Sequence, residues 1–152
     1  MGTTATISEL ATLSGHDLGV SDWLEVTQDH INTFGANTGD QQWIHLDVER
    51  AKAESPFGGP IAHGYLTLSL LIPMWKQLLV VTDAAVSVNY GLDRVRFPSP
   101  VPVGSKVHLT ARITQVQDVS GGGVQVVGDA VMEREGGDKP VCVAEPVFRF
   151  YR

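Results

Sequence analysis

The chain has 152 residues, of which 43% are hydrophobic and 18% charged, so it is long and apolar enough to build one domain around a single core. A net charge of −6 argues against a nucleic-acid-binding protein, because such proteins normally present a basic face. The single cysteine, Cys142, excludes an intramolecular disulfide and a zinc ribbon, and it indicates a reducing, cytoplasmic setting.

Neither a secretory signal nor a membrane-spanning helix is expected. The first ten residues, MGTTATISEL, lack the basic segment and the apolar segment of a signal peptide. The longest apolar run, residues 65–75, is too short to span a bilayer and contains Pro73. These features predict a soluble single domain over residues 1–152 that does not interact with a membrane.

Two short helices are predicted ahead of the apolar run. Thr27 is a suitable N-cap for a helix that carries Ile31 on its apolar face and ends near Gly35–Gly39. Asp47 is a suitable cap for a second helix, VERAKAES, which Pro56 stops.

A longer helix is predicted over residues 64–79. Apolar side chains fall on nearly every face of its first two turns, which is typical of a helix buried on all sides. Pro73 has no N–H to donate to the carbonyl of Ser69, so the helix should bend near its middle.

After Thr82 the apolar residues alternate with polar ones, which indicates strands. The stretch VHLTARITQVQ places one set of side chains on a single face: Val107, Leu109, Ala111, Ile113 and Gln115. Glycine-rich turns at residues 120–123 and 135–139 would join successive strands into an antiparallel meander. We therefore expect an α+β fold in which a curved sheet wraps one buried helix.

The stretch FGANTGDQQWIH contains Asp40 and His45 beside a loop of small and amide side chains. A carboxylate and an imidazole that reach one water molecule can share its proton, one accepting it while the other orients the water or donates. The spacing leaves a second interpretation open, in which Asp40 caps a turn and His45 is a polar surface residue.

The stretch GGPIAHGY leads into the long helix. Gly64 in the first turn would let a ligand approach the backbone, because no Cβ intervenes. The first N–H groups of a helix have no internal partner, so they can stabilise an oxyanion that forms on a carbonyl. In the alternative interpretation Gly64 serves packing at a tight junction and His63 is a partly buried helix cap.

Metal and covalent chemistry are not indicated. A metal site would require Asp40, His45 and His63 to converge, and neither H-E-x-x-H nor H-x-x-E-H is present, so we predict no metal. The nucleophile elbow G-x-S-x-G is absent, and Cys142 lies in an alternating strand where a packed thiol is the ordinary state.

Together the two stretches resemble the MaoC-like, R-specific enoyl-CoA hydratase family. Its motif is approximately an aromatic residue, a short spacer and then G-D-x-N-P-[LIV]-H-x5-[AS]. Phe34 supplies the aromatic residue, Gly39 and Asp40 the G-D pair, Ile44 and His45 the next pair, and Ala51 the closing position. The later stretches GGPIAHGYLTLSLL and NYGLDRVRFPSPVPVGSKV are also similar to the family, so the likeness runs from about residue 22 to the C-terminus.

The chain departs from this motif at two positions. Gln42 and Trp43 stand where the family usually has Asn-Pro. The asparagine often helps to hold the catalytic water or to orient the site, and a bulky Trp43 could change the shape of the acyl pocket.

The resemblance implies a hot-dog fold and the reversible syn addition of water to a trans-2-enoyl thioester, giving an R-3-hydroxyacyl thioester. Asp40 and His45 would activate the water that attacks C3 and return a proton to C2, while the Gly64 N–H stabilises the enolate oxygen. No cofactor beyond the CoA moiety of the substrate is implied. The pair would titrate as a coupled unit, so the formal base is not assigned.

CoA carries several phosphates, and an acidic protein needs a local basic site to bind them. Arg94 and Arg96 alternate onto one strand face, with Lys106 and Arg112 further on, although ordinary solvated strand charges have the same pattern. The candidate substrate-binding residues are Gln42, Trp43, His63, Tyr65, Arg94 and Arg96. The family also implies a homodimer in which the partner lines the acyl tunnel.

Three alternatives stay open: a 3-hydroxyacyl dehydratase that acts on acyl carrier protein, a hot-dog acyl-CoA thioesterase, and a non-catalytic acyl-CoA binder. The G-D-x4-H spacing argues against the thioesterase, and the presence of both Asp40 and His45 argues against the non-catalytic binder. Neither acyl chain length nor metabolic pathway follows from the sequence.

Overall fold

A curved antiparallel sheet dominates the computed structural model, which describes residues 2–152. Its strands are hydrogen-bonded in the order β2-β6-β7-β8-β5, and β3 also pairs with β6. Their bounds are β2 Asp17–Val20, β3 Leu24–Glu25, β5 Val86–Arg96, β6 Lys106–Val119, β7 Gly123–Arg134 and β8 Cys142–Tyr151. A separate parallel pair joins β1 (Thr3–Ala5) to β4 (Leu79–Val81).

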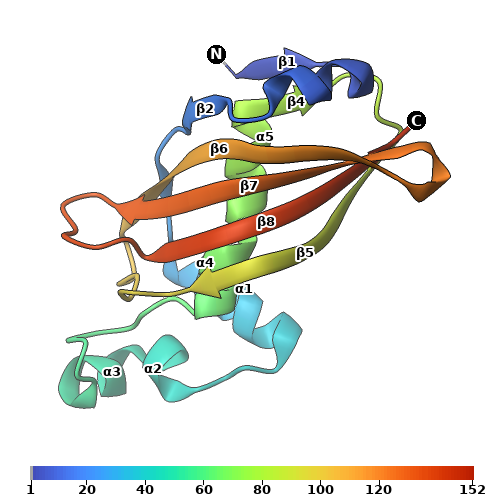
Figure 1. The fold of residues 1–152 in the computed structure, drawn as a ribbon. Coiled ribbons are helices and arrows are strands. Elements are labelled where there is room, and N and C mark those ends of the chain that lie inside the picture. The colour runs from blue at the N-terminus through green and yellow to red at the C-terminus, as the bar shows by residue number, and fades with distance from the viewer. Residues whose placement is uncertain (1) are drawn as a thin grey trace.

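The sheet curves around a central helix, which Figure 1 shows crossing behind β6, β7 and β8. This helix consists of α4 (Gly64–Ser69) and α5 (Leu71–Leu78). It divides at Leu70, directly after the Ser69 carbonyl that Pro73 cannot bond, near the middle of the helix, where the sequence predicts a bend. The arrangement confirms the predicted α+β hot-dog fold.

The core lies between α5 and the concave face of the sheet. Met74 of α5 and Leu109 and Ile113 of β6 are fully buried, as the alternation of β6 predicts. The prediction for Gln115 is wrong, because the pairing of β6 with β7 shifts register between Ile113 and Gln115 and leaves Gln115 exposed.

The first turns of the central helix are not buried on all sides, contrary to the sequence-based prediction. Leu66 and Thr67 are buried, but Tyr65 is 71% exposed and Ser69 is also exposed. Elements of the chain cover only one side of α4.

Apart from a 3-10 turn, η2 (Ser120–Gly122), between β6 and β7, the remaining helices of residues 2–152 precede the central helix. They are the 3-10 helix η1 (Ile7–Leu13) and the α-helices α1 (Gln28–Thr38), α2 (Trp43–Leu46) and α3 (Val48–Glu54). Both predicted caps are confirmed, since Thr27 accepts the N–H of His30 and Asp47 accepts the N–H of Arg50. The four-residue helix α2 was not predicted. Within residues 2–152, no helix is sufficiently long and apolar to cross a membrane.

Gly128 of β7 sets how closely the sheet approaches the central helix. A Cβ at this position would lie 3.0 Å from the Arg112 carbonyl oxygen and 3.0 Å from Cζ3 of Trp75, whose ring terminus would be closer still. We expect Gly128→Ala to lower the free energy of unfolding by about 1–3 kcal/mol, because neither the strand backbone nor the buried Trp75 can retreat freely. Urea denaturation measures this loss. Gly59→Ala, where an added Cβ meets nothing within 4 Å, is the matched control, and equal stability of the two variants would contradict the prediction.

Candidate active site

The loop that carries Asp40 begins where α1 ends. Gly39 ends this helix in the left-handed conformation with φ 76°, and its N–H bonds the carbonyl of Gly35. Glycine adopts this conformation without the steric cost that a Cβ would add. The turn places the exposed carboxyl of Asp40 immediately before α2, which carries His45.

His45 is buried, with 7% of its surface exposed, and its ring is fixed by one hydrogen bond. Nδ1 lies 2.7 Å from the carbonyl oxygen of Ile61. Because a carbonyl only accepts, Nδ1 carries the hydrogen and Nε2 of the neutral ring keeps its lone pair. Burial lowers the pKa of His45, and the positive charge that His63 can carry lowers it further, against the opposing effects of the Ile61 bond and Asp40. The neutral ring is therefore available as a base.

His63 lies against His45 and is 2% exposed. The two rings are stacked, with centroids 4.0 Å apart and an interplanar angle of 27°. Nε2 of His63 lies 2.8 Å from the main-chain carbonyl oxygen of Asp40. His63 occupies the N-cap position of α4, but its side chain makes no capping hydrogen bond.

Asp40, His45 and His63 converge, since one side-chain ligand atom from each lies within 4.8 Å of the other two. A metal ion binds in the plane of an imidazole ring, at the nitrogen lone pair. Two near-parallel planes stacked 4.0 Å apart do not suit one shared ion. The cluster is better suited to proton transfer than to metal binding.

Gly64 and His45 line the same cavity of about 270 Å³. As the first residue of α4, Gly64 has an N–H without a partner inside the helix. An added Cβ would lie 3.1 Å from the Phe97 ring, which gives the glycine a packing reason as well. The other lining residues are Phe57, Ile61, Ala62, Thr67, Phe97, Pro98, Ser99, Pro100, Val101 and Val141.

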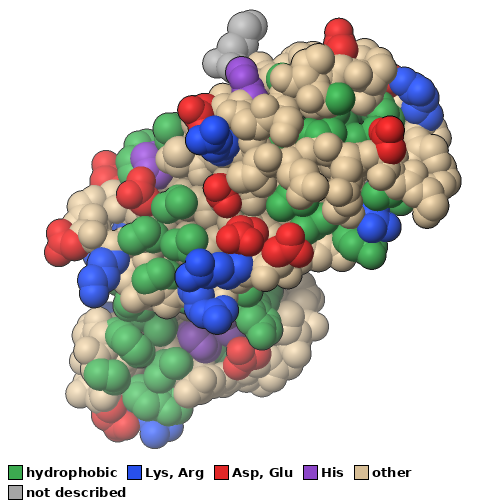
Figure 2. Space-filling view, viewed as in Figure 1, with side chains coloured by type: hydrophobic (Ala, Val, Ile, Leu, Met, Phe, Trp, Pro, Cys, Tyr) green, Lys and Arg blue, Asp and Glu red, His purple; other side chains and the backbone are tan. Residues whose placement is uncertain are grey.

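The predicted substrate-binding residues lie outside the lining of this cavity. Gln42 is at the N-cap position of α2 without a capping bond, and the Arg50 guanidinium lies 4.3 Å from the ring centroid of Trp43. Tyr65 points to solvent, and Arg94 and Arg96 are exposed on β5. Figure 2 shows Lys and Arg side chains gathered over that end of β5, with histidine at the surface just below them.

Three residues near the site were not predicted from the sequence. Phe57 and Phe97 line the cavity, and Gln28 of α1 donates a hydrogen bond from its Nε2 to the main-chain carbonyl of His45 at 2.9 Å. Gln28 gives no signal in the sequence, because its contact joins residues 17 positions apart.

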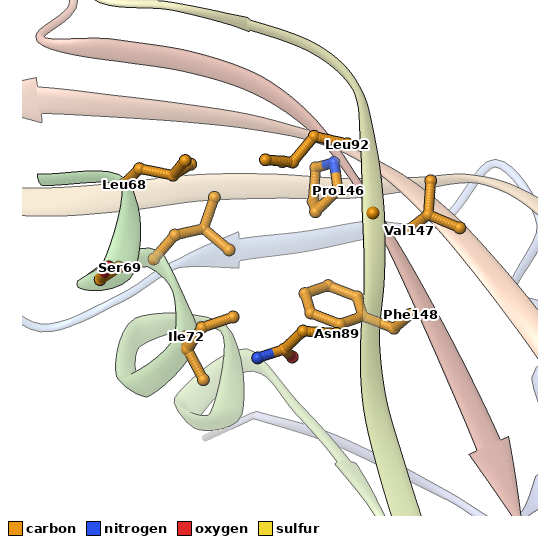
Figure 3. Close-up of a pocket in the computed structure, with 10 residues that line it drawn as sticks. Leu68, Ser69, Ile72, Asn89, Leu92, Pro146, Val147 and Phe148 are labelled. Atoms are coloured by element: carbon orange, nitrogen blue, oxygen red, sulfur yellow. The ribbon is translucent and has the colours of Figure 1, made fainter. Parts of the chain in front are cut away.

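An apolar groove runs between the central helix and strands β5 and β8. Figure 3 shows Leu68 and Ile72 of the helix facing Leu92 of β5 and Phe148 of β8. This part of the groove has a volume of about 200 Å³, and an adjoining part of about 260 Å³ shares Ile72, Asn89 and Phe148 with it.

A sheet wrapped around a central helix is the hot-dog architecture, and at one end of it lie together a carboxylate, an imidazole and a helix-initial glycine. The model of the MaoC like domain matches residues 9–135, and the chain belongs to this dehydratase family. It is a hydro-lyase.

The chain is similar to a curated dehydratase and to solved structures of the same fold. The 3-hydroxyacyl-thioester dehydratase Z of Mycobacterium tuberculosis is 46% identical over 150 residues, which cover 99% of both chains. The structure of the monoamine oxidase regulatory protein from Archaeoglobus fulgius has a TM-score of 0.79 at 27% identity, covering 99% of this chain and 97% of that one. The (R)-hydratase of A. caviae, described as involved in PHA biosynthesis, shares the fold with a TM-score of 0.71 at 22% identity, over 89% and 94% of the two chains.

The lowered pKa of His45 predicts a pH-dependent stability. The unfolded imidazole takes up its proton near the ordinary pKa of 6.5, whereas the folded ring does so only at lower pH. The unfolded state therefore binds more protons as the pH falls below 6.5, and the free energy of unfolding decreases. When the pH is lowered from above 6.5 to below it, the free energy of unfolding should fall less in His45→Gln than in the wild type. Urea denaturation at both pH values measures the two losses. His16→Gln changes an exposed histidine and should behave as the wild type; equal losses in all three proteins would contradict the prediction.

Proposed function

We propose that the protein is an R-specific enoyl-CoA hydratase that reversibly adds water to trans-2-enoyl-CoA. The reverse direction is the dehydration of a 3-hydroxyacyl thioester. The observation that carries this proposal is the cavity in which a neutral His45, with Nε2 free to accept, lies beside Gly64 and close to Asp40. The name of the 46% identical Mycobacterium tuberculosis relative supports the same reaction class.

The chemistry uses the three residues in separate roles. In the hydration direction, Asp40 and His45 hold one water molecule, whose hydroxyl adds to C3 of the enoyl thioester. The proton that this water loses to the pair is delivered to C2 on the same face, so the addition is syn and balanced. Negative charge on the thioester oxygen during this step is stabilised by the Gly64 N–H. Dehydration is the same sequence in reverse.

No cofactor is needed beyond the CoA moiety of the substrate, since every proton transferred comes from the pair or from water. Arg94 and Arg96 are exposed near the end of β5 and are our candidates for contacts with the CoA phosphates. Acyl carrier protein is the alternative carrier, because both carriers present a thioester.

A homodimer is part of the proposal. Strand β5 is an edge of the sheet, and four of its apolar side chains, Val86, Val88, Tyr90 and Leu92, are between 37% and 56% exposed. Exposed apolar edge strands pair readily with another strand. A second copy paired along β5 would also close the open side of the groove beside the central helix.

The catalytic assignment predicts the effect of two conservative substitutions. We expect Asp40→Asn and His45→Gln each to lower kcat by about 100- to 10,000-fold, because each removes a proton-transfer group. The loss of enoyl absorbance measures turnover over a series of acyl chain lengths, with CoA and carrier-protein thioesters compared. His16→Gln is the control. If both variants keep wild-type turnover, the pair is assigned wrongly, and release of free thiol instead of hydration would indicate a thioesterase.

The dimer prediction uses the two edges of the sheet. We expect the double variant Val88→Lys, Leu92→Lys to be monomeric, because the charges would oppose edge pairing along β5. Light scattering after gel filtration measures the mass. Val20→Lys places the same charge on the opposite edge strand, β2, where the valine is 54% exposed, and should leave the dimer intact. A monomeric wild type, or dissociation by Val20→Lys alone, would refute this interface.

A further inference from the structure

His63 makes two contacts to the catalytic pair and lines none of the cavity beside it. Its ring stacks on His45 with a centroid separation of 4.0 Å, and its Nε2 meets the main-chain oxygen of Asp40 at 2.8 Å. Phe34 contacts the His63 ring at a centroid distance of 4.9 Å. His63 is therefore packed between Phe34 of α1 and the pair.

We propose that His63 is a positioning residue that holds the main chain of Asp40 and the ring of His45 in their reactive arrangement. This inference rests on the proposed roles of Asp40 and His45. It replaces substrate binding, the role that the sequence suggested for His63, with a role exerted through the pair.

The hydrogen bond to Asp40 fixes which nitrogen of the His63 ring donates. The Asp40 carbonyl can only accept, so Nε2 of His63 carries the hydrogen and Nδ1 has the lone pair. Nδ1 is buried and meets no hydrogen-bond partner among residues 2–152. The bond to Asp40 is therefore the one hydrogen bond that the His63 ring makes within residues 2–152.

The positive charge that His63 can carry affects the ring stacked on it. The titratable groups that face His45 are Asp40, in the loop after α1, and His63, at the start of α4. Asp40 favours the protonated form of His45, and His63 opposes it. The stacked histidine therefore helps to keep His45 neutral and able to accept a proton.

Two substitutions separate the hydrogen bond from the ring. His63→Phe keeps an aromatic ring against His45 but cannot donate to Asp40. His63→Gln places an amide N–H where Nε2 lies, so it keeps the donor but loses the ring and its charge. We measure kcat, KM and thermal stability for both, with His16→Gln as control, and follow the titration of His45 by NMR of its ring protons.

We expect His63→Phe to lower kcat by about 10- to 100-fold with KM within about threefold, because the Asp40 main chain is no longer held in place. His63→Gln should retain kcat within about threefold, and its His45 should titrate at higher pH than in the wild type. If His63→Phe does not fold, the kcat and the His45 titration of His63→Gln decide the question.

Equal losses of kcat in both variants, in step with thermal stability and with an unchanged His45 titration, would show that His63 only fills the core. Wild-type kcat in His63→Phe would also overturn the proposal. A wild type without hydratase or dehydratase activity would refute the proposed function instead, so the two failures are distinguishable. The NMR titration needs no substrate and tests the coupling of the rings independently.

Discussion

The hydrogen bond from the His45 ring to the Ile61 carbonyl is the interaction on which the site depends, because it joins the helix α2 to the segment that begins the central helix. The Ile61 N–H returns a bond to the carbonyl of Ile44, and the N–H of Ala62 bonds Val101 in the loop before β6. This segment therefore fixes α2 on one side and the sheet on the other. A single carbonyl selects the tautomer of His45 while the backbone around it sets where the ring lies.

Local signals predicted much of the fold, and long-range packing explains what they missed. The caps Thr27 and Asp47 act within three residues of themselves, so the sequence alone identifies them. The prediction for Gln115 is wrong because a register shift in the pairing with β7 turns its side chain to the other face. Alternation in the sequence cannot reveal a shift imposed by a neighbouring strand. The predicted burial of Tyr65 is wrong because apolar residues around a helix do not determine which elements pack against it.

In the active site, too, local signals predicted some features and long-range packing determines the others. Asp40 and His45 are separated by five positions, and a motif could identify them together, although the burial of His45 and its bond to Ile61 are tertiary facts. The stacking of His63 on His45 also depends on the path of the chain between α2 and α4. A histidine beside a helix start has the same sequence signature whether it binds substrate, caps the helix or supports another ring. Only its contacts distinguish these roles.

The exposed side of α4 and the exposed edge strand β5 are connected features. The groove between them is lined by Leu68 and Ile72 from the helix and by Leu92 from the strand, all apolar side chains that a closed domain would cover. The strands of the sheet within residues 2–152 do not cover them, because the order of the sheet ends at β5. The same curvature that buries α5 under β6 and β7 thus leaves α4, which carries Gly64, open beside an edge strand. Pairing along β5 would bring a second chain next to the start of the central helix, so association of two copies and the environment of the active site would be physically coupled.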